Sequence, residues 1–272
     1  MSKLKLVIPI DFSESTINAL HYAQALTRNE DDELVLVHVL NDMSETEAKN
    51  KLKKIAENEI KGFEGVVKTK VINGNIKEHV GNYAEYLDAN FVIMGIHEES
   101  FLDSLLGSKA LDVISNSKVP FITVQHDTKY AKINKIAMTI DLDKDSIQVV
   151  KAAASLAHNM NSELILVAGN HTDLEFKRRV QINLKVATNY LDSQNIKATI
   201  KHLERDDFIN DFIDLCQNEG VNMISATYYL KTLSLFSPKF VQHLMSNKLG
   251  LPVLTVDAQV FSSGPQFPFI TT

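Results

Sequence analysis

The chain has 272 residues, a length that suits one large domain or two of ordinary size. With 44% hydrophobic residues, 23% charged residues and a net charge of -6, disordered and collagen-like chains are excluded. A weakly acidic chain repels nucleic acid and anionic membranes, and apolar runs of about six residues are far shorter than the roughly 20 that span a bilayer. We therefore expect a soluble, cytoplasmic globular protein with neither nucleic acid nor membrane as partner.

The first half of the chain alternates short apolar runs with amphipathic segments. Strands are predicted over Leu4–Ile10, Glu33–Leu40, Val66–Ile72, Phe91–Ile96 and Val119–Val124. Helices are predicted near 14–28, 44–62, 76–88 and 107–117. Ser13 or Ser15 is available to cap the first helix. The strands are rich in Val, Ile and Leu, which favours parallel strands buried on both faces, connected by right-handed crossovers with helices on both sides.

The second half repeats the first at a spacing of roughly 130 residues, which indicates a duplicated domain. Glu33–Val37 aligns without a gap with Glu163–Val167, and the runs at Lys5–Asp11 and Lys135–Asp141 align likewise. Strands are expected near 135–140, 163–168, 196–203, 221–226 and 251–256. The predicted domains span residues 1–127 and 131–257, followed by a tail at 258–272 that repeats nothing.

Cys216 is the only cysteine, so the chain has no intramolecular disulfide, as is usual in a reducing compartment. It ends the run Phe212–Cys216, whose spacing is typical of the buried side of a helix. We expect a core residue there rather than a reactive thiol.

Ligands of open parallel sheets bind beyond the carboxyl ends of the strands, where the strand order reverses. The residues to consider are therefore Pro9–Ser13, His38–Leu40 and Met94–Glu98. The helix predicted after Gly107 can bind an anion, because a glycine lets a phosphate approach the free backbone N–H groups. The Ser108 hydroxyl and the Lys109 charge would add to such a site. The simpler interpretation is a loop and helix cap, and His38 is predicted to be a hydrogen-bonded wall residue rather than a catalytic base.

These segments resemble the universal stress protein family: Pro9-x-Asp11-x-Ser13, His38-Val39, Val92-Ile93-Met94-Gly95-x-His97 and Gly107-Ser108 occur in family order. The resemblance covers roughly residues 3–256 and implies two tandem doubly wound α/β domains, each a five-stranded parallel sheet of order 3-2-1-4-5 with helices on both faces. By analogy with ATP-binding members, Asp11 and Val39 would lie at the nucleoside. The candidate binding residues are Pro9, Asp11, Val39, Met94, Gly95, His97, Gly107, Ser108 and Lys109.

The sequence departs from the family's glycine loop in the first copy and more strongly in the second. Glu98 stands where the second loop glycine belongs, and its carboxylate would repel phosphates unless Mg²⁺ bridges them. In the second copy, Ser225–Tyr229 and Phe236–Lys239 replace the glycine segments. We therefore expect ATP, if bound, in the N-terminal domain only, and a degenerate site with Tyr228, Tyr229 and Phe236 filling the space in the second.

The leading functional hypothesis is a non-enzymatic stress-response protein that binds ATP or another adenine nucleotide. One alternative is a ligand-free module that binds an unknown protein partner, and the other is a slow ATPase. Scattered histidines without metal-ligand spacing argue against a metal site. The resemblance also implies that the two copies pair through their last strands as an intramolecular pseudo-dimer. A homodimer of whole chains is a further expectation.

Overall fold

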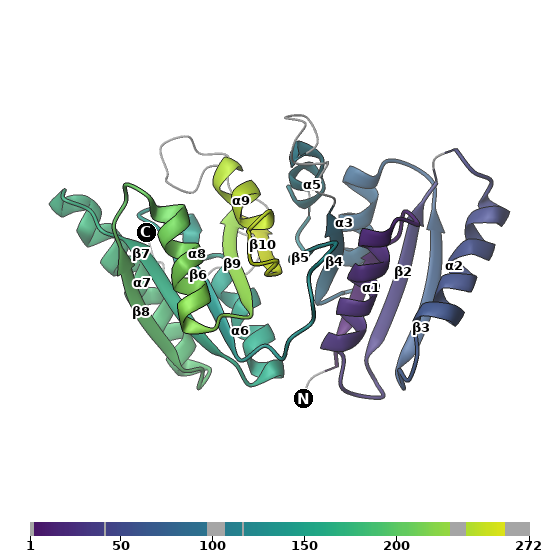
Figure 1. The fold of residues 1–272 in the computed structure, drawn as a ribbon, viewed down its shortest axis with the longest axis horizontal. Coiled ribbons are helices and arrows are strands. Elements are labelled where there is room, and N and C mark those ends of the chain that lie inside the picture. The colour runs from purple at the N-terminus through teal and green to yellow at the C-terminus, as the bar shows by residue number, and fades with distance from the viewer. Residues whose placement is uncertain (1–2, 41, 97–106, 116, 229–237, 259–272) are drawn as a thin grey trace. The chain divides into compact units, whose positions relative to one another are not determined.

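The structure is a computed structural model that describes residues 3–40, 42–96, 107–115, 117–228 and 238–258, with residues 107–109 and 238 described through their backbone alone. The chain divides into an N-terminal unit, Met1–Tyr130, and a C-terminal unit, Ala131–Thr272. Each unit is an α/β domain built on five parallel strands, and the two are described separately below (Figure 1).

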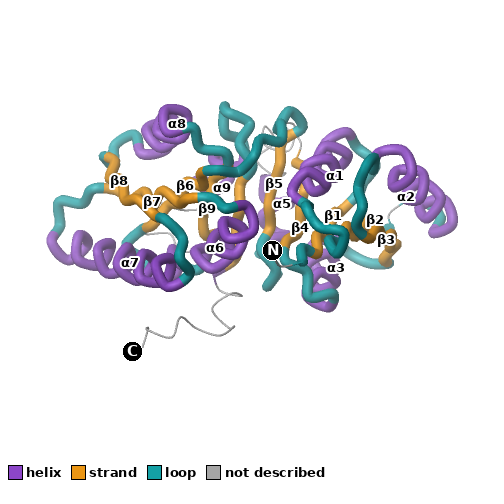
Figure 2. Tube along the Cα trace, turned by 90° about the horizontal axis from the view of Figure 1, so that it is seen from below, coloured by secondary structure: helices purple, strands orange, loops and turns teal. Residues whose placement is uncertain are grey.

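The N-terminal unit contains five parallel strands in the order β3-β2-β1-β4-β5. Their bounds are β1 Lys5–Pro9, β2 Glu33–Val39, β3 Val66–Ile72, β4 Phe91–Ile96 and β5 Phe121–Gln125. The helices are α1 Glu14–Leu26, α2 Glu45–Glu59, α3 Ile76–Tyr86 and α5 Gly107–Ile114. Helices α1 and α2 cover one face of the sheet and α3 covers the other (Figure 2). The core lies between these layers, where Leu6, Ile8 and Leu36 are fully buried.

The C-terminal unit repeats this topology, with its parallel strands in the order β8-β7-β6-β9-β10. The strands are β6 Lys135–Ile140, β7 Glu163–Gly169, β8 Ala198–Leu203, β9 Met223–Tyr228 and β10 Val253–Asp257. The helices are the 3-10 turn η1 Lys144–Ile147, α6 Val149–Met160, α7 Leu174–Ser193, α8 Phe208–Glu219 and α9 Pro238–Met245. The predicted doubly wound fold with sheet order 3-2-1-4-5 is confirmed in both units.

The expectation that all the strands are buried on both faces is wrong for β3 and β8. Lys68 and Lys70 of β3 are exposed, as are Ile200 and Lys201 of β8. These strands lie at the outer edge of their sheets, where neighbouring helices cover them incompletely. Exposed lysines on an edge strand oppose pairing with another chain, so these positions are polar for a physical reason.

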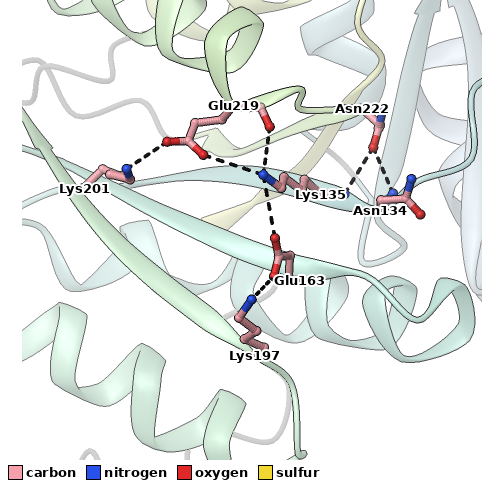
Figure 3. Close-up of polar contacts among 7 residues, drawn as sticks. All are labelled: Asn134, Lys135, Glu163, Lys197, Lys201, Glu219 and Asn222. Atoms are coloured by element: carbon pink, nitrogen blue, oxygen red, sulfur yellow. Dashed lines mark hydrogen bonds and ion pairs between the residues drawn. The ribbon is translucent and has the colours of Figure 1, made fainter.

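The same polar contacts occur at the amino ends of β1 and β6, the first strands of the two units. In the N-terminal unit, Lys5 donates its backbone N–H to Asn90 Oδ1 at 2.7 Å and its Nζ to the carbonyl oxygen of Leu87. In the C-terminal unit, Lys135 donates its backbone N–H to Asn222 Oδ1 at 3.2 Å and its Nζ to the carbonyl oxygen of Glu219 at 2.9 Å (Figure 3). Matching contacts of this kind are expected when both units derive from one ancestral domain.

The C-terminal unit extends this contact into a chain of alternating charges. Lys135 lies between Glu219 and Glu163, at 3.6 and 3.8 Å (Figure 3). The two carboxylates also meet Lys201 and Lys197, at 2.8 and 2.5 Å. The five side chains thus connect three strands with the end of α8.

Within the described ranges, no helix combines the length and apolar character required to cross a bilayer.

Candidate functional site

A cavity of about 520 Å³ lies at the carboxyl ends of the strands in the N-terminal unit. Five of the predicted binding residues line it: Pro9, Asp11, Val39, Met94 and Gly95. Further lining residues come from α1, the end of β2 and the start of α3, and they include Thr16, Leu40, Gly74, Asn75 and Ile76. The sequence does not predict that the start of α3 lines the cavity. The Gly74-Asn75 pair signals a turn and a helix cap, but not that this turn lies beside the ends of β1 and β2.

The cavity opens where β1 leaves the sheet. The last pair between β1 and β2 joins Pro9 to Val37, whereas β2 remains paired with β3 as far as Val39 and Ile72. Within the described chain, Val39 therefore has no strand partner on the β1 side. Since β2 and β4 lie on opposite sides of β1, this is the point at which the strand order reverses, and such points bind ligands in doubly wound sheets.

Asp11 organises the turn from β1 into α1. Its Oδ1 accepts hydrogen bonds from the Ser13 backbone N–H at 2.9 Å and from Thr16 Oγ1 at 3.1 Å, and the Ser13 hydroxyl also donates to it. Ser13 is the N-cap residue by position, but its side chain makes no capping hydrogen bond. The prediction that a serine side chain caps this helix is therefore wrong for Ser13, whose hydroxyl is oriented to donate to Asp11 and accepts from no helix N–H.

Phe12 follows Asp11 with a φ of 71°, in the left-handed region that is uncommon for a bulky residue. Its ring lies 4.5 Å from that of His38, which is only 2% exposed. The His38 Nδ1 donates to the carbonyl oxygen of Ile10 at 2.7 Å. His38 is thus a hydrogen-bonded wall residue of the cavity, in agreement with its predicted role.

Gly95 has a structural reason to be a glycine. A Cβ at this position would lie 2.2 Å from the carbonyl oxygen of Ser15 and 2.9 Å from the backbone nitrogen of Thr16. The first turn of α1 therefore packs directly on β4, and only a residue without a side chain permits this approach. Gly95 shapes the cavity by letting α1 begin close to the sheet.

The remaining predicted residues lie on the segment that follows β4. Gly107, Ser108 and Lys109 form the first turn of α5, as the sequence predicts. His97 and Glu98 lie outside the described residues, so their predicted roles stay predictions. Among the described residues, no group of three or more His, Cys, Asp or Glu side chains has the geometry of a metal site.

In the C-terminal unit, buried polar side chains gather around the end of β6. Asp141, the counterpart of Asp11, is 2% exposed, and its carbonyl oxygen accepts a 2.7 Å hydrogen bond from Asn183 of α7. Beside it, Arg205 donates to Nδ1 of the buried His171 at 2.6 Å. Burial and the Arg205 charge lower the pKa of His171. Tyr228 is buried, whereas Tyr229 and Phe236 lie outside the described residues.

Comparison with known proteins shows which proteins this chain resembles in sequence. Residues 4–125 match the model of the Universal stress protein family. A universal stress protein of Methanocaldococcus jannaschii is 29% identical over 152 aligned residues, covering 44% of this chain and 94% of that protein.

Two solved structures extend the similarity in fold to almost the whole chain. A universal stress protein from Archaeoglobus fulgidus has a TM-score of 0.71 and 14% identity, covering 95% of this chain and 100% of that one. A putative universal stress protein from Pseudomonas aeruginosa has a TM-score of 0.62 and 12% identity, with 96% of both chains covered. At such identities the similarity concerns the fold alone.

The fold and the cavity define a protein built from two doubly wound α/β domains, the first of which has a ligand-sized cavity at its switch point. The N-terminal unit, through residues 4–125, matches the universal stress protein family, which is the family that the sequence motifs indicate.

Proposed function

We propose that the N-terminal unit binds one adenine nucleotide in the cavity at the end of β1, and that the C-terminal unit has a structural role. The observation that carries the proposal is the convergence of Pro9, Asp11, Val39, Met94 and Gly95 on one cavity. By the motif resemblance, the matching positions or their neighbours lie at the nucleotide in ATP-binding members of the family.

The chemistry of the cavity suits a nucleoside. The side chains of Val39, Met94 and Ile76 offer apolar surface to a flat base, and the backbone of Val39, unpaired on the β1 side, can hydrogen-bond to the edge of the base. The carboxylate of Asp11 is an acceptor for sugar hydroxyls. The N–H groups that open α5 at Gly107 are donors for phosphate, with Ser108 and Lys109 in the same turn. Mg²⁺ would be required if Glu98 faces the phosphates.

We assign the site a role in binding rather than in catalysis. Asp11 Oδ1 already accepts hydrogen bonds from Ser13 and Thr16, so the carboxylate serves the turn into α1 and is poorly placed as a general base. A slow ATPase would show itself as phosphate release that survives purification and disappears in Asp11→Ala.

The proposal is tested by calorimetric titration of the full chain with ATP, ADP and AMP, with and without Mg²⁺. We expect one nucleotide per chain, weakened at least tenfold by Asp11→Ala. The matched control is Asp141→Ala at the corresponding position of the C-terminal unit, which should leave nucleotide affinity unchanged. Two nucleotides per chain would contradict the assignment of a structural role to the C-terminal unit. No heat with any of the three would instead favour the module that binds only proteins.

A further inference from the structure

Helix α7 carries apolar side chains that the C-terminal unit does not cover. The helix lies on the face of the sheet opposite α8 (Figure 2). Leu174 is 82% exposed and Ile182 is 52% exposed. Every residue from 172 to 179 is exposed, and Val180 is the first buried residue of the helix. Packing within the unit therefore does not explain why large apolar side chains occur here.

Four exposed cations share this part of the helix, and none of them has an ion-pair partner among the described residues. They are Lys177, Arg178, Arg179 and Lys185. The nearby carboxylate of Asp173 caps the helix instead, because it accepts from the backbone N–H groups of Glu175 and Phe176 at 2.8 and 3.0 Å. The outer surface of α7 is thus positive on a chain whose net charge is -6.

Helix α2 of the N-terminal unit shows the usual alternative, a charged helix that faces only water. Its exposed lysines pair with glutamates one turn away, as Lys51 does with Glu47 at 3.0 Å. On α7 the residues one turn before and one turn after Arg178 are Leu174 and Ile182. The α7 surface therefore lacks the internal pairing that neutralises α2.

Leu174, Arg178 and Ile182 form what we call the α7 stripe. Residues four apart lie on one face of a helix, so the stripe extends over about 12 Å with its cation between two apolar side chains. A lipid surface favours helices whose apolar and charged faces are separate, which this arrangement is not. A second helix packed alongside meets such a stripe with about one residue in every turn.

We propose that the α7 stripe and its flanking cations bind an amphipathic helix of another protein, one that carries carboxylates beside leucine-like side chains. Charge complementarity selects an acidic partner, and the exposed Leu174 and Ile182 supply the apolar contact. The α7 helix of a second copy does not fit, because two cationic stripes repel each other. The proposal is independent of nucleotide binding by the N-terminal unit.

The test selects a display library of helical peptides of about 16 residues, roughly 24 Å long, on the immobilised full-length chain. We expect the enriched peptides to combine Asp or Glu with Leu or Ile three and four positions apart. The tightest peptide is then titrated by fluorescence anisotropy. Leu174→Ser should weaken its binding about tenfold through the lost apolar contact. Arg178→Glu should weaken it about fivefold, by less as the salt concentration rises.

Lys53→Glu on α2 is the matched control. It makes the same change from cation to anion on an exposed helix surface, at a lysine whose side chain is 73% exposed, and it should leave peptide affinity unchanged. The α7 variants should keep the circular dichroism of the wild type, because both side chains are exposed and the cap at Asp173 is intact.

Three results would overturn the proposal. The first is a selection that enriches no acidic helix, or a selected peptide whose affinity neither α7 substitution changes. The second is binding of the wild type to vesicles of equal parts phosphatidylcholine and phosphatidylserine that Arg178→Glu abolishes, which would assign the stripe to lipid. The third is a dimer in sedimentation experiments that Arg178→Glu dissociates, which would assign it to a second copy of the chain.

Discussion

Thr227 donates a hydrogen bond from Oγ1 to the carbonyl oxygen of Ser146 at 3.0 Å, at the point of the C-terminal unit where Gly95 meets Ser15 and Thr16 in the N-terminal unit. Thr227 Oγ1 also accepts a hydrogen bond from the backbone N–H of Val149 at 3.3 Å. The threonine side chain thus lies where the first turn of α1 packs directly on Gly95 in the N-terminal unit. As a consequence the turn after β6 is the 3-10 segment Lys144–Ile147, and the α-helix starts only at Val149.

Gly95→Ala should destabilise the N-terminal unit and weaken nucleotide binding. Its Cβ would lie 2.2 Å from the carbonyl oxygen of Ser15, so α1 must move away from β4, at a cost of about 1–3 kcal/mol in the free energy of unfolding. Urea unfolding and calorimetry of the same preparation measure both effects. The control is Gly62→Ala, where a Cβ would meet nothing within 4 Å but the φ of 64° strains any side chain. It should lose about 1–2 kcal/mol of stability and leave nucleotide affinity unchanged, which separates destabilisation from loss of the cavity. An alanine at position 95 that binds nucleotide as tightly as wild type would contradict this account of the cavity.

Thr227→Val should lower the free energy of unfolding by about 1–3 kcal/mol, because the volume is kept while a buried donor and acceptor lose their partner. The expected cause is the unsatisfied N–H of Val149. Thr188→Val is the control, since its hydroxyl bonds an exposed helical carbonyl and its loss should change stability little. If both variants have the same urea midpoint, the threonine does not set the start of α6.

Acidification should remove the stabilisation that comes from Glu163. Its hydrogen bond to Lys197 is the main cause that lowers its pKa below the usual 4.5. A carboxylate whose pKa is lowered by folding stabilises the protein above its unfolded pKa, and that contribution disappears as the pH falls through the folded value.

The corresponding measurement compares the melting temperatures of wild type and Glu163→Gln between pH 7 and pH 3. The wild type should be the more stable protein at neutral pH, and the difference should shrink below roughly pH 4.5. Glu57→Gln serves as control, because its 3.8 Å ion pair with Lys53 lies on an exposed helix surface. A difference that is constant over this range would show that Glu163 acts through packing rather than charge.

Cys216 should not react in the native protein. It is fully buried, and burial raises the pKa of its thiol to about 12, so almost no thiolate exists at neutral pH. A colorimetric thiol assay should count no reactive group in the folded chain and one after unfolding in guanidinium chloride. Rapid labelling of the folded chain would mean that α8 opens readily.

Sequence pattern predicted the elements well where they are long and periodic. The predicted bounds of β3 and β4 match those observed, and the predicted β5 lies two residues too early at its start, at Val119 instead of Phe121. Helices end earlier than predicted, for example α1 at Leu26 rather than near residue 28, because the terminal turns lack the hydrogen bonds that extend a helix.

Part of the site was also readable from the sequence. Asp11, Val39 and Gly95 lie at or just beyond the carboxyl ends of predicted strands, and parallel strands bring such ends to one edge of the sheet. The start of α3 at Gly74–Ile76 could not be placed at the cavity in this way, since only the packed sheet brings it beside β2. Nor does any local signal reveal the left-handed backbone of Phe12.

The order of residues along the chain, by itself, determined the duplicated architecture and the parallel sheets, because alternation of apolar and polar residues records locally which side of each element is buried. Tertiary structure alone decided which atoms meet: that a carbonyl of α1 lies against Gly95, that Asn183 donates to the backbone of Asp141, and that Asp11 accepts from Thr16. Such contacts join segments far apart in the chain, and their geometry depends on how whole layers pack, which no local pattern encodes.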